Sequence, residues 1–283
     1  MIKPLIILIF VCYLIVYLYP FTMIERLPYD KKTLTYYMGV PLVIHRSYNN
    51  RYANQKMFKA CHQKWIELNP KYQVIWYTYA QRDLFMKDFN KRVYNAYKLI
   101  NPGAFKADIW RLCILYKYGG IYVDSHTTPV KDMSYIMKYL LPQEHNFISV
   151  LDCKEAGGGV HNGFIVSSAR HPFLKQCIDD IVNTIEQRSY TDHVLAVTGP
   201  LCLENSIRKV LGNKESFEQG YNYNGQLTFY LLKFEWGISQ WIYDKGIRIM
   251  SKKYNALEYF YNKIIQMKKG YGYMWRNKML YKE

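Results

Sequence analysis

The segment FKADIWRLCILYKYGGIYVDSHTTPV, residues 105–130, is the part of the sequence that most clearly indicates the fold. Its first half carries apolar residues at helical spacing, so we predict a helix over residues 104–118. Gly119-Gly120 ends that helix, and the apolar residues 121–123 then predict a short buried strand. A helix that leads into a strand through a tight turn is typical of α/β proteins.

The rest of the chain repeats this alternation. Short apolar runs predict strands, and longer segments with a spacing of three to four residues predict helices. The expected strands lie at 41–45, 72–77, 146–151 and 164–167, and the expected helices at 57–68, 82–90, 93–100, 173–187 and 201–211. The sequence therefore predicts an α/β fold with a central, mainly parallel sheet in a single domain.

A pair of charged residues interrupts the apolar face of the helix at 104–118. On a helical wheel Asp108 lies in the middle of that face and Arg111 at its edge. Burying two charges is costly when packing is the only gain. Two interpretations remain open: an internal ion pair, or a polar pair directed into a pocket at the edge of the sheet.

A second polar group follows the strand at 121–123. Asp124, Ser125 and His126 come directly after it, and in open α/β sheets ligands bind outside the carboxyl ends of the strands. An acidic residue with a second potential ligand two positions later is suited to a divalent cation. Asp152 likewise closes the apolar run at 147–151 and is a further candidate for this edge.

These residues resemble glycosyltransferase family 32, the DXD-type enzymes. That family includes the yeast initiating α-mannosyltransferase and many bacterial and viral sugar transferases. The catalytic segment is also similar to that of the large clostridial glucosylating toxins. The strongest match is K-A-D-x-x-R-x-x-x-L-x-x-Y-G-G-I-Y-x-D at 106–124. The other matches are P-x-V-I-H at 41–45, W-x-x-x-N-P-x-Y at 65–72, N-G-F-I-x-S at 162–167, H-P-F at 171–173 and T-G-P at 198–200.

The resemblance implies a GT-A fold, a nucleotide-sugar donor, a divalent metal and retention of the anomeric configuration. The metal would be Mn²⁺, with Mg²⁺ as an alternative. Asp108 would bind donor sugar hydroxyls, Arg111 would approach the sugar and diphosphate, and Asp124 would contact the ribose and the metal. His45 and Asn162 would lie at the donor-binding edge. A hydrogen-bonded core histidine is the alternative for His45.

His126 departs from the family pattern, because the third position of the D-x-D motif is normally Asp. Asp124 and His126 would then be the metal ligands, since neutral imidazole binds divalent metals. Three outcomes remain open. The enzyme is active with altered metal binding, it is active with basic residues replacing part of the metal's role, or it is a catalytically silent nucleotide-sugar or glycan-binding relative.

The first residues predict a membrane anchor. Residues 5–21, LIILIFVCYLIVYLYPF, are uncharged and reach the short end of the range for a spanning helix. A cleaved signal peptide needs small residues at its cleavage site, and residues 20–23 offer none. We expect an anchor at 1–23, a stem at 24–40 and a catalytic domain at 41–283. The protein would be single-pass, in a Golgi- or ER-type or a viral or host membrane, with its body lumenal or external.

The amino-acid composition limits the classes of molecule that the protein is expected to bind. Half of the residues are hydrophobic and 17% are aromatic, which excludes a globally disordered chain. The net charge of +16 favours anionic partners, but no nucleic-acid-binding motif accompanies it. We therefore expect a nucleotide-sugar donor, a glycan, lipid or protein acceptor, and no nucleic acid. The six cysteines form no C-x-x-C and are expected as free, mostly buried thiols. Trp236, Trp241 and Trp275 could stack on sugars or belong to the core.

Overall fold

A computed structural model describes residues 34–47, 55–142, 146–154, 157–212, 217–224, 226–236, 240–252 and 270–283. The strands are β1 (Tyr36–Tyr37), β2 (Val40–Pro41), β3 (Val43–Ser47), β4 (Gln73–Tyr77), β5 (Gly120–Val123), β6 (Thr127–Pro129), β7 (Phe147–Leu151), β8 (Val160–Ser167), β9 (Gly220–Tyr223), β10 (Thr228–Glu235), β11 (Gln240–Asp244) and β12 (Ile247–Lys252). The helices are α2 (Gln55–Leu68), α3 (Tyr79–Phe89), α4 (Lys91–Leu99), α5 (Gly103–Tyr118), α6 (Met133–Tyr139), α7 (Pro172–Glu186), α8 (Pro200–Leu211) and α10 (Tyr271–Arg276), with a 3-10 turn, η3 (Val194–Ala196).

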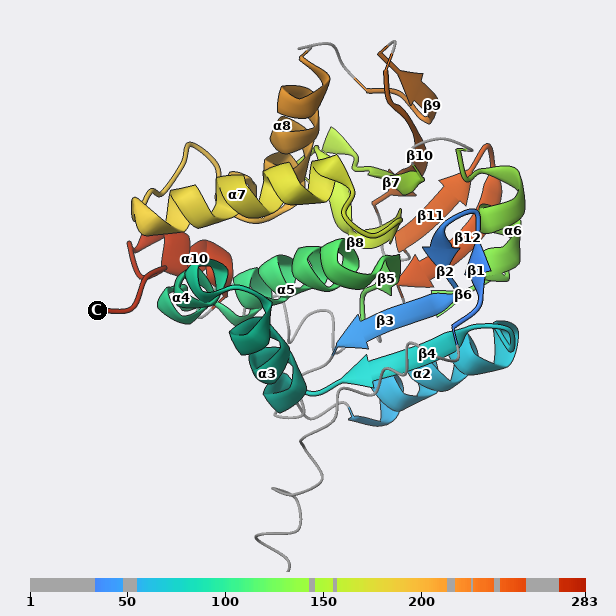
Figure 1. Cartoon of the computed structure of the whole chain (residues 1–283), viewed down its shortest axis with the longest axis horizontal. Coiled ribbons are helices and arrows are strands. Elements are labelled where there is room, and N and C mark those ends of the chain that lie inside the picture. Colours follow the sequence, from blue (N-terminus) through green and yellow to red (C-terminus); the bar gives the residue numbers. More distant parts are fainter. Residues whose placement is uncertain are drawn as a thin grey trace, which may run out of the picture.

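Ten of these strands form one sheet (Figure 1). Its order is β4-β3-β5-β8-β7-β10-β11-β12-β6, and β9 pairs with β10 outside this path. Strands β4, β3 and β5 pair in parallel, and so do β7 and β10. Strand β8 lies between β5 and β7 and runs antiparallel to both. The carboxyl ends of β5 and β7 therefore meet the first residues of β8 at one edge of the sheet.

The expected α/β class is confirmed, but the expectation of a mainly parallel sheet is wrong. The sheet is mixed because several consecutive strands are joined by short links. Parallel neighbours need a crossover of a dozen or more residues, whereas a short link reverses the chain. The link from β7 to β8 spans only residues 152–159, and Lys245-Gly246 alone joins β11 to β12. Both turn residues have positive φ, 44° and 85°, as a two-residue hairpin requires.

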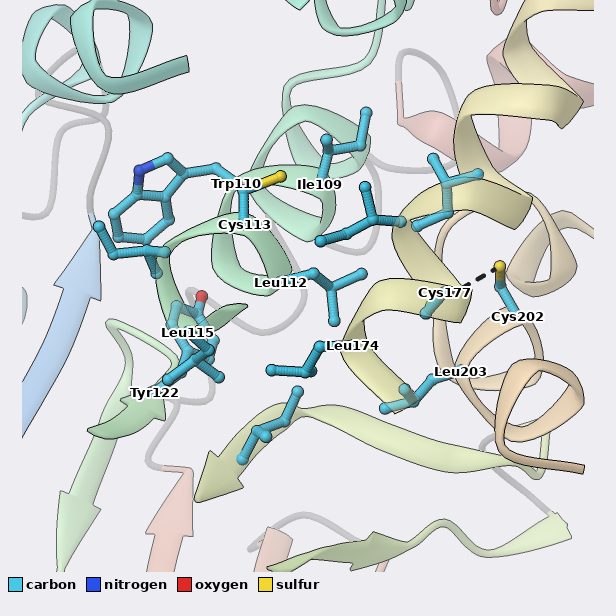
Figure 2. Close-up of a cluster of buried hydrophobic side chains, with 14 of the residues drawn as sticks. Ile109, Trp110, Leu112, Cys113, Leu115, Tyr122, Leu174, Cys177, Cys202 and Leu203 are labelled. Carbon is cyan, nitrogen blue, oxygen red and sulfur yellow. Dashed lines mark hydrogen bonds between the residues drawn. The ribbon is translucent and has the colours of Figure 1, made fainter. Parts of the chain in front are cut away.

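Helices cover both faces of the sheet. Successive residues of the central strands alternate between two apolar clusters, as a strand's period of two requires. Phe147 and Ile165 face α5, α7 and α8, whereas Ile148 and Val166 face the side of α2 and α6. Figure 2 shows the first cluster, where side chains of α5 meet those of α7 and α8. The cysteines in the described residues are free thiols, as expected.

The glycine pair after α5 is required by close packing. Gly119 and Gly120 have φ of 73° and 105°, a region that favours glycine. A Cβ on Gly119 would lie 2.8 Å from the backbone nitrogen of Ala169, and one on Gly120 would lie 2.8 Å from the carbonyl oxygen of Val43. The pair therefore lets α5 turn directly into β5, which brings the end of β5 close to the helix face that carries Asp108.

The expected anchor at 1–23 and most of the expected stem lie outside the described residues. Among the residues that the structure describes, no helix has the length and apolar character to cross a membrane. Residues 34–40 precede the expected domain boundary. Val40 is nevertheless fully buried in the cluster on the α2 side of the sheet.

Candidate functional site

A cavity of about 250 Å³ opens where the carboxyl ends of β5 and β7 meet the start of β8 and the first turns of α5. Polar residues form its floor, and apolar and aromatic residues form its walls. The cavity is lined by Ala104, Phe105, Asp108, Arg111, Asp124, Asp152, His161, Asn162, Val194, Leu195, Gly199, Pro200, Phe234, Trp236 and Tyr271.

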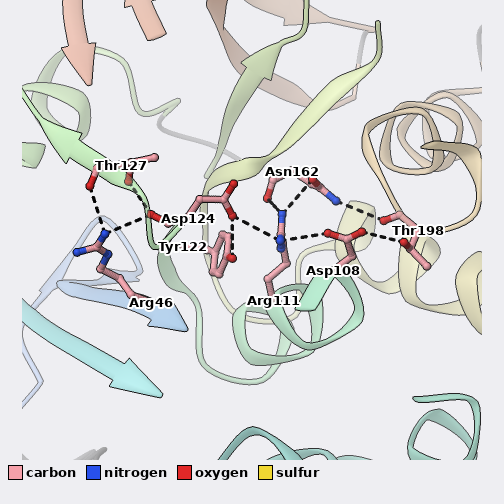
Figure 3. A network of polar contacts seen from close by, with 8 residues as sticks. All are labelled: Arg46, Asp108, Arg111, Tyr122, Asp124, Thr127, Asn162 and Thr198. Atoms are coloured by element: carbon pink, nitrogen blue, oxygen red, sulfur yellow. Dashed lines mark hydrogen bonds and ion pairs between the residues drawn. The ribbon is translucent and has the colours of Figure 1, made fainter. Parts of the chain in front are cut away.

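Arg111 lies at the centre of the polar floor (Figure 3). Its Nη2 is 3.1 Å from a carboxylate oxygen of Asp108 and 3.5 Å from one of Asp124. Its Nη1 donates to the carbonyl oxygen and to the side-chain oxygen of Asn162, at 2.8 and 3.0 Å. The guanidinium also lies 4.5 Å from the ring centroid of Tyr122. One cation thus holds two carboxylates and an amide in a fixed arrangement.

The two carboxylates are also held from their other sides. Thr198 donates its hydroxyl to Asp108 at 2.8 Å, and Tyr122 donates its hydroxyl to Asp124 at 3.0 Å. Both interpretations of the Asp108–Arg111 pair therefore apply at once, because the two residues form an ion pair and also line the cavity.

Burial sets the charges of this floor. It raises the pKa of Asp108 to about 6, although Arg111 and the Thr198 hydroxyl oppose that rise. Burial alone would lower the pKa of Arg111, but Tyr122, Asp108 and Asp124 together hold it above its usual value. Burial also raises the pKa of the Tyr122 phenol well above its usual range. Arg111 is therefore a fixed cation, and Asp108 is ionised above about pH 6.

An irregularity in β8 directs consecutive residues into the cavity. The register between β7 and β8 shifts between Ile148 and Val150, as in a β-bulge. The hydroxyl of Ser149 donates to the carbonyl oxygens of His161 and Phe164, which flank the shift. His161 and Asn162 are neighbours in sequence, and in a regular strand they would point to opposite faces. Here both line the cavity.

His161 is held in one orientation. Its ring stacks on Phe234 with centroids 5.1 Å apart, and its Nδ1 is 3.3 Å from a carboxylate oxygen of Asp152. Its Nε2 and the Oδ2 of Asp124 each lie 2.6 Å from the point where Gly163 would carry a Cβ. The missing side chain of Gly163 is therefore what allows this imidazole and this carboxylate to approach each other.

His45 lies beneath the cavity rather than in it. It is fully buried, and its ring nitrogens are 3.1 Å from the Tyr77 hydroxyl and 3.0 Å from the carbonyl oxygen of Gly119. Burial lowers its pKa to about 4, so the ring is neutral. These surroundings are those of the hydrogen-bonded core histidine that the sequence left open as the alternative to donor binding.

His126 lies on the turn after β5, is half-buried, and is not among the residues that line the cavity. The turn itself is held by Arg46, whose Nη2 lies within hydrogen-bonding distance of the carbonyl oxygens of Asp124, Ser125 and Thr127. Trp65 adds a hydrogen bond from its indole to Thr127 at 2.9 Å. Of the two expected metal ligands, only Asp124 faces the cavity.

Residues 55–146, which contain α5, β5 and their charged residues, match the protein family described as a glycosyltransferase sugar-binding region containing a DXD motif. This segment of the chain is therefore similar to a glycosyltransferase sugar-binding region. The resemblance seen in the sequence is thereby confirmed over this segment.

Two curated yeast proteins are similar to more than half of the chain. Mannosyl phosphorylinositol ceramide synthase CSH1 of Saccharomyces cerevisiae is 26% identical over 164 residues, 57% of this chain and 41% of that protein. Inositol phosphoceramide mannosyltransferase 3 of Schizosaccharomyces pombe is 26% identical over 173 residues, 58% of this chain and 44% of that protein. The chain thus spans less than half the length of the curated relatives it matches.

Solved structures give more distant matches. The PaToxG glycosyltransferase superposes with a TM-score of 0.47 and 15% identity, covering 60% of this chain and 70% of that one. The catalytic domain of alpha-toxin from Clostridium novyi superposes with a TM-score of 0.39 and 10% identity, covering 63% and 65%. The GT-A assignment stays a prediction.

The matched segment, residues 55–146, supplies only part of the cavity. Asp108, Arg111 and Asp124 lie within it, whereas Asn162 and Thr198 come from later elements. The N-G-F-I-x-S and T-G-P matches point to these later positions. Sequence reasoning missed His161, whose one available signal was its place directly before Asn162.

The aromatic wall was predicted in part. Trp236 is 51% exposed and lines the cavity. Trp241 instead packs under the guanidinium of Arg248, and the indole of Trp275 donates to the carbonyl oxygen of Tyr190. Phe234 and Tyr271 complete the wall and were not predicted.

Proposed function

We propose that the protein transfers a hexose-type sugar, with retention, from a nucleotide-sugar donor to an acceptor at this cavity. The observation that carries the proposal is the fixed set of two carboxylates and an amide around Arg111, at the floor of an aromatic-walled cavity. Carboxylates accept hydrogen bonds from sugar hydroxyls, and an exposed aromatic ring packs against a sugar's apolar face.

Arg111 acts as a positioning residue in this proposal. Both of its terminal nitrogens are engaged by Asp108, Asp124 and Asn162. It therefore fixes where Asp108 meets the sugar, and its fixed positive charge stabilises negative charge that develops on the leaving diphosphate. Lysine could not replace it, because a single ammonium cannot span both carboxylates and the amide.

The named activities of the two yeast relatives suggest the substrates. We propose mannose as the first donor sugar to test and an inositol-phosphate lipid as the first acceptor, with glycan and protein acceptors as the alternatives. The proposed setting is a secretory or viral membrane, with the body on the lumenal or external side.

A divalent metal fits this site if the donor completes its coordination. No group of three or more His, Cys, Asp or Glu residues in the described part of the chain is placed to hold an ion. Such metals are commonly held by one or two protein ligands together with substrate phosphates. We propose that Asp124 and His161 are those ligands, and Asp152 holds the imidazole through Nδ1, as partners of metal-binding histidines do. When bound, the metal, Mn²⁺ or Mg²⁺, neutralises charge on the diphosphate.

The activity is tested by screening nucleotide sugars for hydrolysis and transfer with Mn²⁺. We expect turnover with a mannose donor, and loss of that turnover in Asp124→Asn. A wild-type protein that binds donors and turns none over would identify the catalytically silent relative instead.

The metal ligands are tested by direct Mn²⁺ binding in the presence of a nucleoside diphosphate. We expect His161→Ala to weaken Mn²⁺ binding, with the matched variant His126→Ala remaining close to wild type. The reverse ranking would restore His126 as the ligand that the D-x-D spacing predicts.

A further inference from the structure

A second cavity, of about 360 Å³, lies where α3, α4 and the start of α5 come together. It is lined by Tyr79, Ala80, Arg82, Asp83, Tyr97, Gly103 and Lys106. It shares no lining residue with the first cavity, where we propose that the sugar binds and which we call the sugar-binding cavity. Gly103 and Lys106 lie on a different face of α5 from Asp108 and Arg111. Its volume falls within the range of small-molecule sites.

Arg82 brings an uncompensated charge to this cavity. The residue is only 3% exposed, and its Nε is buried without a hydrogen-bond partner. Its guanidinium lies over the ring of Tyr79, 4.2 Å from the centroid, and 5.9 Å from that of Trp110. Within the described residues, no carboxylate lies within ion-pair distance of it. A buried charge without a counter-ion is costly, so such a group in a cavity points to an anion from outside the chain.

A second cation faces the same space. The ammonium of Lys106 lies 4.9 Å from the ring centroid of Tyr97. Burial, together with the charges of Lys282, Lys98 and Arg82, lowers the pKa of Lys106 to about 8 against the opposing effect of Asp83. Asp83 is the one carboxylate in the lining, and it accepts a hydrogen bond from Tyr94 at 3.5 Å. Positive charge therefore exceeds negative charge around the cavity.

Two helix N-termini add to this positive potential. Tyr79 is the first residue of α3 and Gly103 the first of α5, and both line the cavity. Thr78 caps α3 with its side chain, whereas Pro102 gives α5 no side-chain hydrogen bond. The amide groups of a first helical turn bind anions well, phosphate in particular.

We propose that this cavity binds the phosphate group of a small molecule or lipid headgroup, with Arg82 and Lys106 as its ligands. Arg82 would supply the planar, multiple-donor contact that suits phosphate oxygens, and Lys106 a point charge. The site is independent of the sugar-binding cavity, so either proposal can fail alone.

The test is equilibrium binding to the full-length chain, with inorganic phosphate and glycerol 3-phosphate as soluble probes. Vesicles of phosphatidylcholine with and without phosphatidic acid provide the lipid probe. We expect Arg82→Gln and Lys106→Gln each to weaken binding by about tenfold or more, since each removes a charged hydrogen-bond donor. The exposed matched control Arg170→Gln should bind as the wild type does.

Soluble-probe binding that both cavity variants weaken would support a small-molecule ligand. Binding to phosphatidic acid vesicles alone, weakened by the same two variants, would support a lipid headgroup. The proposal is overturned if none of the phosphate probes binds, or if Lys106→Gln, a half-buried position that folding tolerates better than Arg82, binds them all as the wild type does.

Discussion

Asp108 carries a charge at a position where burial opposes it. Its pKa of about 6 shows that burial outweighs the stabilising contacts from Arg111 and Thr198. A carboxylate that is buried in a cavity at the expense of its hydration is suited to binding the hydrogen-bond donors of a ligand. Its ionised form accepts such hydrogen bonds better than its neutral form does.

Replacing Asp108 by Asn should therefore damage sugar handling selectively. Loss of a charged acceptor costs about 1.5–3 kcal/mol, so we expect donor hydrolysis to fall by roughly tenfold to a hundredfold. Affinity for the bare nucleoside diphosphate should be retained. Hydrolysis rates and diphosphate binding measured side by side provide the check, with the exposed Asp88→Asn as the control. Equal losses in both measurements would contradict a role at the sugar.

The burial of His45 predicts how the stability of the protein, rather than its activity, depends on pH. Its folded-state pKa of about 4 lies below the 6.5 of a free imidazole, because burial disfavours the charged ring. The stability that it contributes is complete above pH 6.5 and is lost as the pH falls towards 4, on the order of 3 kcal/mol in all. Glutamine cannot titrate, so we expect His45→Gln to lose less of its free energy of unfolding than the wild type as the pH falls from 6.5 to 4.

The measurement is the free energy of unfolding by urea between pH 7 and 4. The loss should be reduced only in part, since burial also lowers the pKa of His62 to about 4. An unchanged slope in His45→Gln would mean that the ring is not held neutral.

At the scale of elements, the irregular strand β8 decides the composition of the site. Its register shift places His161 and Asn162 together in the cavity, and Gly163 leaves the space in which His161 approaches Asp124. A bulge next to a binding site is a common way to redirect side chains.

Adding one methyl group at Gly163 should therefore disable the site without unfolding the protein. A Cβ there would lie 2.6 Å from both His161 Nε2 and Asp124 Oδ2, so both groups must move. We expect Gly163→Ala to lose most metal-dependent hydrolysis and Mn²⁺ affinity, while its melting temperature stays close to wild type. Gly272→Ala, where a Cβ meets only ordinary contact, is the control. Wild-type Mn²⁺ affinity in Gly163→Ala would argue against the proposed ligand pair.

The regular elements could be predicted from the sequence, because apolar periodicity is a local signal. The helix at 104–118, its glycine stop and the strand at 121–123 match α5 and β5 closely. Strands β9 to β12 were missed, although Lys245-Gly246 between two apolar segments is a usable hairpin signal. The direction of β8 and the place of His161 depend on pairing between distant strands, and no local pattern encodes that pairing.

At the scale of the whole molecule, the C-terminal residues complete the core beside the site. Tyr281 forms a bridge with Ile100, and the amide of Lys282 donates to the carbonyl oxygen of Leu99 at 2.8 Å. Leu280 is fully buried in the cluster that contains α5. The last residues are thus joined to the segment that leads into α5.

Shortening the side chain of Leu280 should therefore lower the free energy of unfolding of the protein. Leu280→Ala removes a fully buried side chain, and such changes cost about 2–5 kcal/mol. Its exposed neighbour Met279→Ala should cost within about 0.5 kcal/mol. The free energies of unfolding of the two variants in urea provide the check. If they are equal, the C-terminal residues do not belong to the hydrophobic core.

The contacts of Arg46 have a consequence for how this sequence can change over generations. Arg46 holds the turn after β5 through carbonyl oxygens, and every amino acid carries one. The path of the backbone there is independent of which side chains stand at positions 125 and 126. The residue at position 126 can therefore change while Asp124 keeps its place. Substitutions at these two positions leave the backbone contacts in place, whereas a change at Arg46 would remove all three contacts that its side chain makes to the turn.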